Sequence, residues 1–112
     1  MKMKLTTFSL ITCLGMFTCQ AEPSKEAVKN WRTNCLSCHG ADGKGETKAG
    51  RKSKAKDLTD ATYQASFSDD QAFKSIKEGL KKDGKELMKS YGEKLTDEEI
   101  KELVAYSRSF KK

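Results

Sequence analysis

The feature that most constrains this chain is a five-residue run, Cys35-Leu36-Ser37-Cys38-His39. Two cysteines three positions apart, followed directly by histidine, are typical of the covalent attachment of a c-type haem. Their thiols can reach the two vinyl groups on one edge of the porphyrin, and the adjoining imidazole then lies within reach of the iron. The run therefore predicts one haem c, held covalently by Cys35 and Cys38, with His39 as an iron ligand.

The N-terminal segment is typical of a secretory signal peptide. Two lysines in the first four residues are followed by an apolar stretch, residues 5–17, which is short for a transmembrane helix. The small residue Ala21 then predicts cleavage that leaves residues 22–112 as one domain. We therefore expect a signal peptide over residues 1–21 and a periplasmic protein. The alternative is lipidation at Cys19, although the residues before it match a lipoprotein cleavage site poorly.

The cysteine count excludes a disulfide-stabilised domain. The chain has four cysteines, and two of them, Cys13 and Cys19, leave with the expected signal peptide. Cys35 and Cys38 alone can close only a very small loop, which stabilises little. A domain this short buries a modest apolar core, so a large covalently bound macrocycle would add needed stability.

Three segments show helical periodicity, and no strand pattern is visible. The first spans residues 24–35, the second residues 69–80 and the third residues 97–110. Capping boxes, Ser68 with Gln71 and Thr96 with Glu99, mark the starts of the second and third. The sequence thus predicts an all-α fold of three main helices, joined by long connections over residues 40–67 and 81–94.

Two other uses of paired cysteines compete with haem attachment. A structural zinc site needs about four protein ligands, whereas residues 22–112 contain only Cys35, Cys38 and His39 as cysteines and histidines. A thioredoxin-like redox pair belongs at the end of a strand in a βαβ unit, and no such unit is visible. Haem attachment is therefore favoured over a zinc site and over a redox-active cysteine pair.

Few residues of the chain could serve as the second axial ligand of the iron. His39 is the only histidine, which rules out two histidine ligands from this chain. Met88 is the only methionine after the expected signal peptide, and it lies in a polar loop rather than on an apolar helical face. We therefore predict Met88 as the second ligand. The alternatives are a methionine that fills a gap in the core, ligation by Lys85 or Lys89, and an open sixth position.

At this point the chain resembles a small bacterial class I cytochrome c with one haem. Residues 35–45 are similar to the family's attachment segment, and Trp31 matches the aromatic that usually precedes it. Residues 103–106 resemble the last-helix motif that packs on the first helix, where Ala27 permits close crossing. The resemblance implies the cytochrome c fold around a covalently bound haem, with cavity-lining side chains that we expect from Leu58, Tyr63, Phe67 and Phe73.

Two positions depart from the family's pattern. Lys89 follows Met88 where the family often has proline, and Tyr91 occupies the later aromatic place. The family also often has a proline after the attachment segment, whose carbonyl accepts a hydrogen bond from the ligating histidine. This chain has none there, so a carbonyl between Ala49 and Leu58 is expected to accept the His39 bond.

The resemblance and the ligand set together imply a one-electron carrier rather than an enzyme. Imidazole and thioether stay bound to ferrous and ferric iron alike, which suits electron transfer and disfavours oxygen chemistry. The rival functions are a haem ligand-binding sensor or peroxidase-type protein with a labile sixth ligand, and a haem subunit of a larger oxidoreductase complex.

The charge distribution suggests the partners. The formal net charge is +6, and four lysines surround Met88 in sequence: Lys81, Lys82, Lys85 and Lys89. Such a run is either an ordinary solvated face or a docking face for redox proteins with acidic surfaces. We expect a monomer that binds no nucleic acid and meets a membrane only by docking to membrane complexes or, as the alternative, through Cys19.

Overall fold

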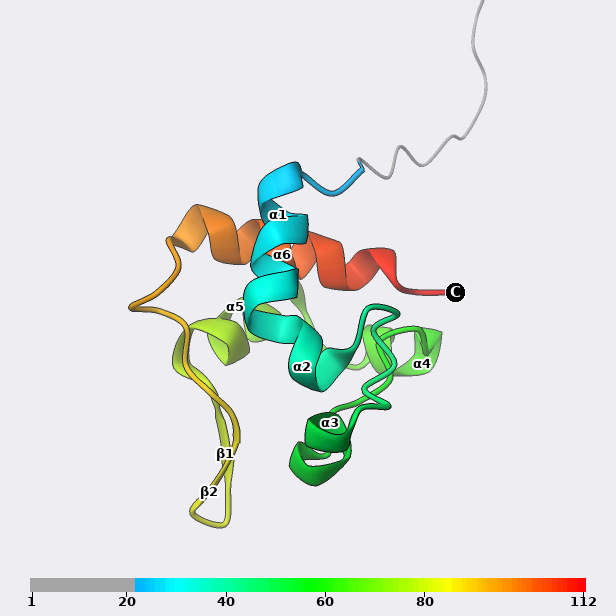
Figure 1. Cartoon of the computed structure of the whole chain (residues 1–112), viewed down its shortest axis with the longest axis vertical. Helices are drawn as coiled ribbons and strands as arrows, with labels where there is room; N and C mark the ends of the chain where they lie inside the picture. The colour runs from blue at the N-terminus through cyan, green and yellow to red at the C-terminus, as the bar shows by residue number, and fades with distance from the viewer. Residues whose placement is uncertain (1–21) are drawn as a thin grey trace, which may run out of the picture.

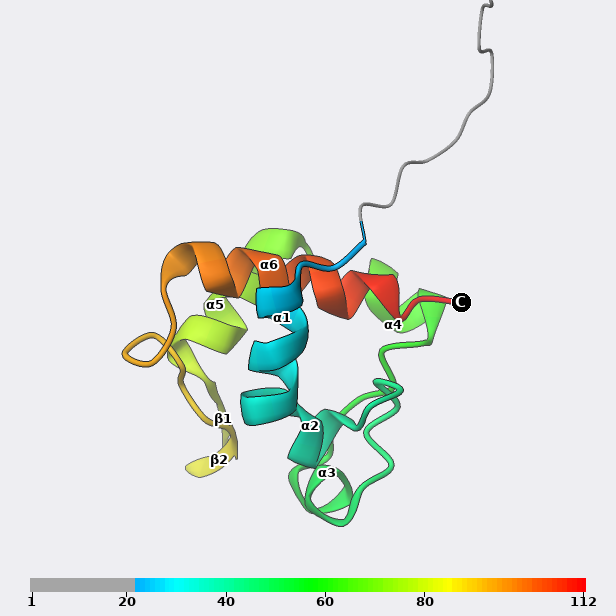
Figure 2. The ribbon, with the colours of Figure 1, turned by 45° about the horizontal axis from the view of Figure 1, so that its top comes forward.

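The computed structural model describes residues 22–112. The expected signal peptide, with Cys13 and Cys19, lies outside the described residues. Helices surround a small core, and the first and last helices cross each other in both ribbon views (Figures 1 and 2). None of the helices in residues 22–112 has the length and apolar character needed to cross a bilayer.

The first helical segment is longer than predicted and changes pitch within itself. It comprises α1 (Lys25–Asn30), a π-helical turn η1 (Trp31–Cys35) and α2 (Leu36–His39). The Ser24 hydroxyl caps its start by accepting the Ala27 N–H, and Gly40, at φ 79°, ends it. The segment predicted over residues 24–35 therefore continues through His39, which places the whole attachment run on helical backbone.

The other two predicted helices start at their predicted caps. Both capping boxes are present, Ser68 with Gln71 at the start of α5 (Asp69–Glu78) and Thr96 with Glu99 at the start of α6 (Asp97–Ser109). These reciprocal bonds satisfy N–H groups that have no partner within the helix. The cap residues thus determine where each helix begins.

Helix α6 crosses α1 at small and polar side chains. Ala27 on α1 is 1% exposed, so nothing larger fits at the crossing without displacing α6. Asn30 Nδ2 donates to Glu99 Oε2 at 2.9 Å, and Ser24 Oγ donates to Glu102 Oε2 at 2.9 Å. These two bonds, one helical turn apart on α6, set the relative position of the two helices.

The connection predicted over residues 40–67 contains two short helices. They are α3 (Lys48–Ser53), capped by the Thr47 side chain, and α4 (Ala61–Ala65), capped by Asp60. The Thr47 hydroxyl also donates to the Ser37 carbonyl at 2.7 Å. This bond fastens the connection to the segment that carries the two cysteines.

A β-hairpin replaces the predicted end of the second helix, and the prediction that the chain contains no strand is wrong. Strands β1 (Leu80–Lys82) and β2 (Lys85–Met88) pair antiparallel, and the hairpin projects away from the helices (Figure 1). The turn residues Asp83 and Gly84 both have positive φ, 53° and 74°, as in the two-residue turns favoured by Asp-Gly. Gly79, at φ 79°, ends α5 two residues before its predicted end.

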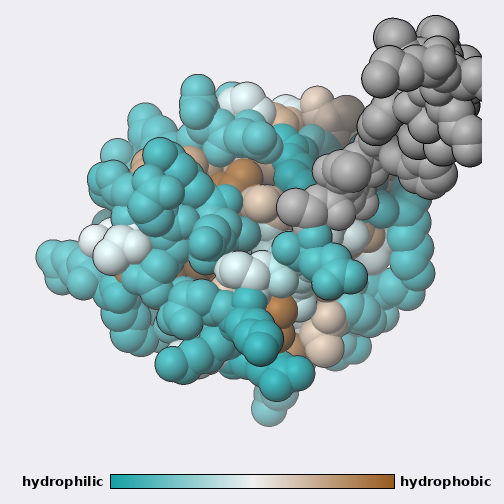
Figure 3. Space-filling model, turned by 90° about the horizontal axis from the view of Figure 1, so that it is seen from above, coloured by the Kyte–Doolittle hydropathy of each residue, from teal (hydrophilic) through white to brown (hydrophobic). Residues whose placement is uncertain are grey.

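Aromatic and aliphatic side chains form one core beneath these elements. Its buried members are Trp31, Cys35, Leu58, Leu95, Ile100 and Leu103. Trp31 packs edge-on against Tyr106, with ring centroids 5.2 Å apart, and against Phe110 at 5.0 Å. Most of the outer surface in Figure 3 is hydrophilic, with apolar residues visible only in seams between polar ones.

Arg108 joins three parts of the fold to α6. It donates to the carbonyls of Gln64 and Phe67 and to Asp69 Oδ1, the last at 2.9 Å, and its guanidinium lies 4.3 Å from the centre of the Phe67 ring. Buried Gln64 in turn donates to the carbonyls of Leu58 and Ser107, both at 2.8 Å. The network fixes the segment 58–69 against α6.

Candidate functional site

An apolar cavity of about 300 Å³ lies where the helical attachment segment (residues 25–39), α4, α5, the hairpin and α6 meet. The attachment segment contributes Trp31, Cys35 and His39, and the hairpin contributes Leu80 and Met88. The remaining lining residues come from the segment between them and from α6: Leu58, Tyr63, Ser66, Phe67, Gln71, Ala72, Ser75, Ile76, Leu103 and Ser107. The tertiary structure thus places His39 and Met88 on the wall of one cavity.

His39 ends α2 and is not fully hydrogen-bonded. Its Nδ1 atom is buried without a partner within residues 22–112, and its ring lies 5.5 Å from the Trp31 ring between centroids. Burial lowers the pKa of the imidazole, which favours the neutral form that binds metal ions. The side chain therefore has the protonation state that a metal ligand needs, and its Nδ1 has no bond within residues 22–112.

The expected hydrogen bond from His39 to a carbonyl between Ala49 and Leu58 is absent from the described residues. The loop after this segment instead makes a hydrogen bond to the backbone of His39: the Gly45 N–H donates to the His39 carbonyl at 2.9 Å. The same loop closes on itself through the Leu58 N–H, which donates to the Gly43 carbonyl at 2.8 Å.

Cys35 and Cys38 are both free thiols. Cys35 is buried and lines the cavity, whereas Cys38, one helical turn later, is half-buried and is not among the lining residues. Burial, and secondarily the neighbouring Cys38, raises the pKa of Cys35 to about 12. A redox-active cysteine pair shows the opposite, a lowered pKa. No group of three or more His, Cys, Asp or Glu side chains that could hold a metal ion occurs in residues 22–112.

Met88 lies on a strand rather than in the loop that the sequence predicted. It is the last residue of β2, half-buried, and pairs in register with Leu80 of β1. A Cβ at Gly79 would approach the Met88 carbonyl oxygen to 2.6 Å, so the backbones of α5 and β2 meet there without room for a side chain. This close approach holds the methionine beside the cavity.

Sequence reasoning identified part of the cavity wall. Leu58, Tyr63 and Phe67 line the cavity as expected, but Phe73 does not. The predicted wall leaves out Ile76 and Leu80, and Leu80 lines the cavity from β1 rather than from the predicted helix. The Asp83-Gly84 pair was the available signal, since Asp-Gly between two short runs favours a hairpin turn.

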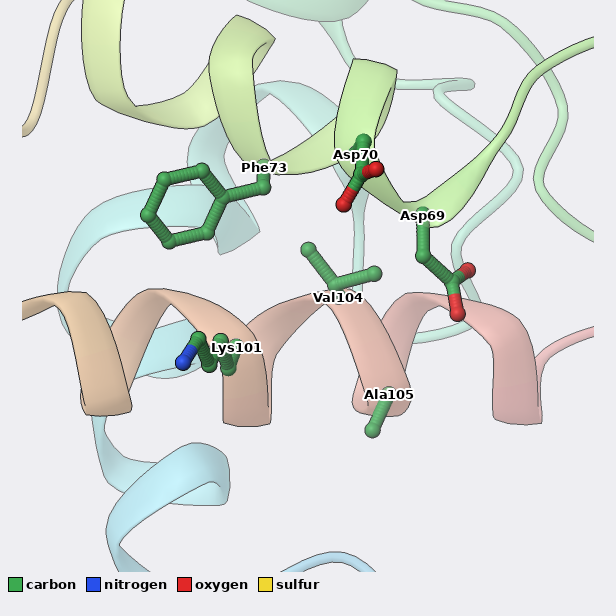
Figure 4. A pocket seen from close by; sticks show the side chains of 6 residues that line it. All are labelled: Asp69, Asp70, Phe73, Lys101, Val104 and Ala105. Atoms are coloured by element: carbon green, nitrogen blue, oxygen red, sulfur yellow. The ribbon is translucent and has the colours of Figure 1, made fainter.

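A second cavity, of about 380 Å³, lies between α5 and α6 and contains Phe73 (Figure 4). Val104 and Ala105 line it together with the charged residues Asp69, Asp70 and Lys101. It contains no cysteine, histidine or methionine, and it lies apart from the attachment run. Although this cavity is the larger, its residues offer no covalent or soft ligand, so the first cavity is the candidate site.

Comparison with known proteins agrees with this geometry. The model of the family described as cytochrome c oxidase, cbb3-type, subunit III matches residues 22–106. The chain belongs to this family of c-type cytochromes. The family is one of electron carriers, and membership implies haem c as the cofactor.

Solved structures with the same fold include two forms of one protein. The structure titled KustC0563 c-type cytochrome is 40% identical, with a TM-score of 0.70, and the alignment covers 77% of this chain and 98% of that one. A structure of a tyrosine-to-phenylalanine mutant of the same cytochrome is 38% identical, with a TM-score of 0.68, covering 77% and 99%. No curated protein matches the chain.

The residues at the cavity of this c-type cytochrome suit haem c. The wall is mainly apolar, as a porphyrin requires, and the free Cys35 thiol is part of it. The half-buried His39 has a buried Nδ1 without a partner in residues 22–112, and the Met88 thioether lines the same space. A soft sulfur ligand and a neutral imidazole are both ordinary axial ligands of haem iron.

Proposed function

We propose that this c-type cytochrome carries one haem, attached through Cys35 and Cys38 and ligated by His39 and Met88, and transfers single electrons in the periplasm. One observation carries the proposal: His39 and Met88, far apart in the sequence, line one apolar cavity together with Cys35. When bound, the haem supplies a reversible one-electron couple between ferrous and ferric iron.

The chain's own residues would set the properties of that couple. A methionine ligand raises the reduction potential relative to a second nitrogen ligand. Aromatic and aliphatic wall residues, such as Leu58 and Phe67, keep water away and disfavour the more highly charged ferric state. If Met88 binds the iron as proposed, it would occupy the position that oxygen or peroxide needs, which favours a carrier over a sensor or a peroxidase.

The hairpin provides a docking face for redox proteins with acidic surfaces. Lys81, Lys82, Lys85 and Lys89 are all exposed, and Leu80 among them is 44% exposed while also lining the cavity. An exposed apolar side chain next to exposed charges resembles the centre and rim of a transient protein interface. The proposal includes a monomer that does not bind nucleic acid and reaches membranes by docking to membrane complexes or, alternatively, through lipidation at Cys19.

A haem subunit of a larger oxidoreductase is the second candidate, and the family's description favours it. Against it, the alignment covers 98% of the KustC0563 c-type cytochrome, so that relative consists of little more than this one domain. Size-exclusion chromatography of the native protein from its own cells separates the candidates. A carrier elutes at its monomer mass, and a subunit elutes with its complex.

Spectroscopy of the purified ferric protein tests the ligand set. We expect a sulfur-to-iron charge-transfer band that disappears in Met88→Ala and persists in Leu87→Ala. Leu87 is the matched control, because it neighbours Met88 on β2, is also half-buried and does not line the cavity. A high-spin ferric spectrum in the unsubstituted protein, with ready binding of carbon monoxide to the ferrous form, would overturn the carrier proposal.

A further inference from the structure

Tyr91 connects the two sides of the cavity. It follows Met88 by three residues, and its hydroxyl donates to the backbone carbonyl of Asn34 at 2.9 Å. Asn34 directly precedes Cys35 in the π-helical turn η1. The bond therefore joins the segment that carries Met88 to the segment that carries the cysteines and His39.

Within residues 22–112 this is the one hydrogen bond between segment 79–95 and segment 22–50. The other bonds of the Tyr91 region lead to α5, since the Tyr91 N–H donates to the Ile76 carbonyl and the Gly92 N–H to the Lys77 carbonyl, both at 3.0 Å. Helix α5 thus supports the base of the hairpin, whereas among the hydrogen bonds of residues 22–112 only that of the Tyr91 hydroxyl joins this segment to the attachment segment.

The acceptor of the Tyr91 hydrogen bond lies in the π-helical turn η1. In η1 the Leu36 N–H donates to the Trp31 carbonyl, five residues back, instead of to the carbonyl four residues back. Such turns widen a helix and often occur at functional sites. Here the widened turn ends beside Tyr91, and its Asn34 carbonyl accepts a side-chain donor from another part of the chain.

Packing and protonation both favour the observed position of the Tyr91 side chain. Its ring is half-buried and packs against the core cluster that contains Trp31, Cys35 and Leu95. Burial, followed by the nearby Cys35, Cys38 and Glu86, raises the pKa of the phenol, so the hydroxyl keeps the proton that it donates. By contrast, Lys89 occupies the position next to Met88 where the related cytochromes often have a rigid proline.

We propose that Tyr91 is a positioning residue whose hydroxyl, by bonding Asn34, holds the Met88 strand against the attachment segment and so keeps Met88 at the cavity. The inference rests on the proposed ligation by Met88. The hydroxyl bond acts on the position of the strand and does not itself touch the ligand. Its loss therefore makes Met88 easier to displace by an external ligand without removing the methionine.

Imidazole binding to the ferric holoprotein tests this role in Tyr91→Phe, which keeps the ring and removes the hydroxyl. Imidazole competes with Met88 for the iron, so its affinity reports how firmly the methionine is held. We expect imidazole to bind about threefold to tenfold more tightly, the range that the net value of one hydrogen bond implies. The control is Tyr106→Phe, since Tyr106 is half-buried in the same core but does not line the cavity. It should bind imidazole like the unsubstituted protein.

The outcomes separate this inference from the proposed function. If Tyr91→Phe binds imidazole with unchanged affinity while Met88→Ala loses the charge-transfer band, Met88 is the ligand and the positioning role is wrong. If the unsubstituted protein lacks the band, the ligand proposal itself is wrong. Urea unfolding of the same proteins gives a further check. If Tyr106→Phe is as stable as Tyr91→Phe and gains as much imidazole affinity, the gain reflects general loosening of the core, and the inference is wrong.

Discussion

The indole N–H of Trp31 donates a 3.0 Å hydrogen bond to the backbone carbonyl of Gly40, across the segment that carries Cys35, Cys38 and His39. Trp31 is 4% exposed, and Gly40 is also buried. The bond therefore links, in a buried position, the two ends of the segment that contains Cys35, Cys38 and His39.

Trp31→Phe should destabilise the protein by about 1–3 kcal/mol, because it leaves the buried Gly40 carbonyl with only the long bond from the Gly43 N–H, at 3.4 Å. Urea unfolding of the purified protein measures the change. Tyr106→Phe, which alters the ring that packs edge-on against Trp31, should change the unfolding free energy by less than about 0.5 kcal/mol. Equal losses in both variants would show that general aromatic packing, and not the hydrogen bond from Trp31 to Gly40, is responsible.

Gly50→Ala should cost at least about 1–3 kcal/mol, since over-packing against rigid atoms forces the backbone to move. A Cβ at this position would lie 2.2 Å from the Cys38 carbonyl oxygen and 2.5 Å from the Gly45 carbonyl oxygen. Both are backbone atoms that cannot move aside cheaply. Ala49→Ser, on the exposed side of the same short helix, is the control and should be nearly neutral. Thermal unfolding checks both, and a neutral Gly50→Ala would contradict the close approach of α3 to the attachment segment.

Reversal of two hairpin charges, Lys82→Glu with Lys85→Glu, should slow electron transfer to an acidic redox protein by about tenfold or more at low salt. These lysines face each other in the register of β1 and β2, so their charges add at one place. Stopped-flow rates over a range of ionic strength measure the effect. Rates for the unsubstituted protein should fall steeply with salt.

The control for the hairpin carries Lys25→Glu with Lys111→Glu, which changes the net charge equally at sites outside the hairpin. If both double variants slow transfer to the same extent, overall charge and not the hairpin governs association. A rate that is flat against salt would make the hairpin lysines ordinary surface residues.

Stability should fall with acid partly through Glu99. Its pKa is lowered from 4.5, first by the Thr96 N–H, then by the Asn30 side chain and the Thr96 hydroxyl. Since the folded-state pKa is below the unfolded one, this contribution is fully present above pH 4.5 and is lost as pH falls through the lower folded-state value. Urea midpoints measured from pH 6 downward should therefore decline less steeply in Glu99→Gln than in the unsubstituted protein. Glu98→Gln, in the same helical turn but without these partners, should keep the original slope.

Local sequence rules determined much of the helical framework. Ser68 with Gln71 and Thr96 with Glu99 set the starts of α5 and α6, because a capping box needs only residues that are three positions apart. The attachment run is equally local, since its chemistry depends on the spacing of Cys35, Cys38 and His39. The sequence does not predict the hairpin because its strands contain three lysines, which conceal the apolar alternation expected of a strand, so only Asp83-Gly84 indicates a turn.

The tertiary structure decided which distant side chains meet. Met88 could be named from the sequence because no other methionine follows the expected signal peptide, but its place on β2 follows from how Gly79 lets α5 and the hairpin approach. The Arg108 network and the bond between Tyr91 and Asn34 link segments dozens of residues apart. Such contacts depend on how the helices pack, since the energy of a long-range hydrogen bond is available only after packing has brought its two groups together. The sequence by itself therefore predicted the chemistry of haem attachment, and only the packing of α5, α6 and the hairpin decided that His39 and Met88 share one cavity.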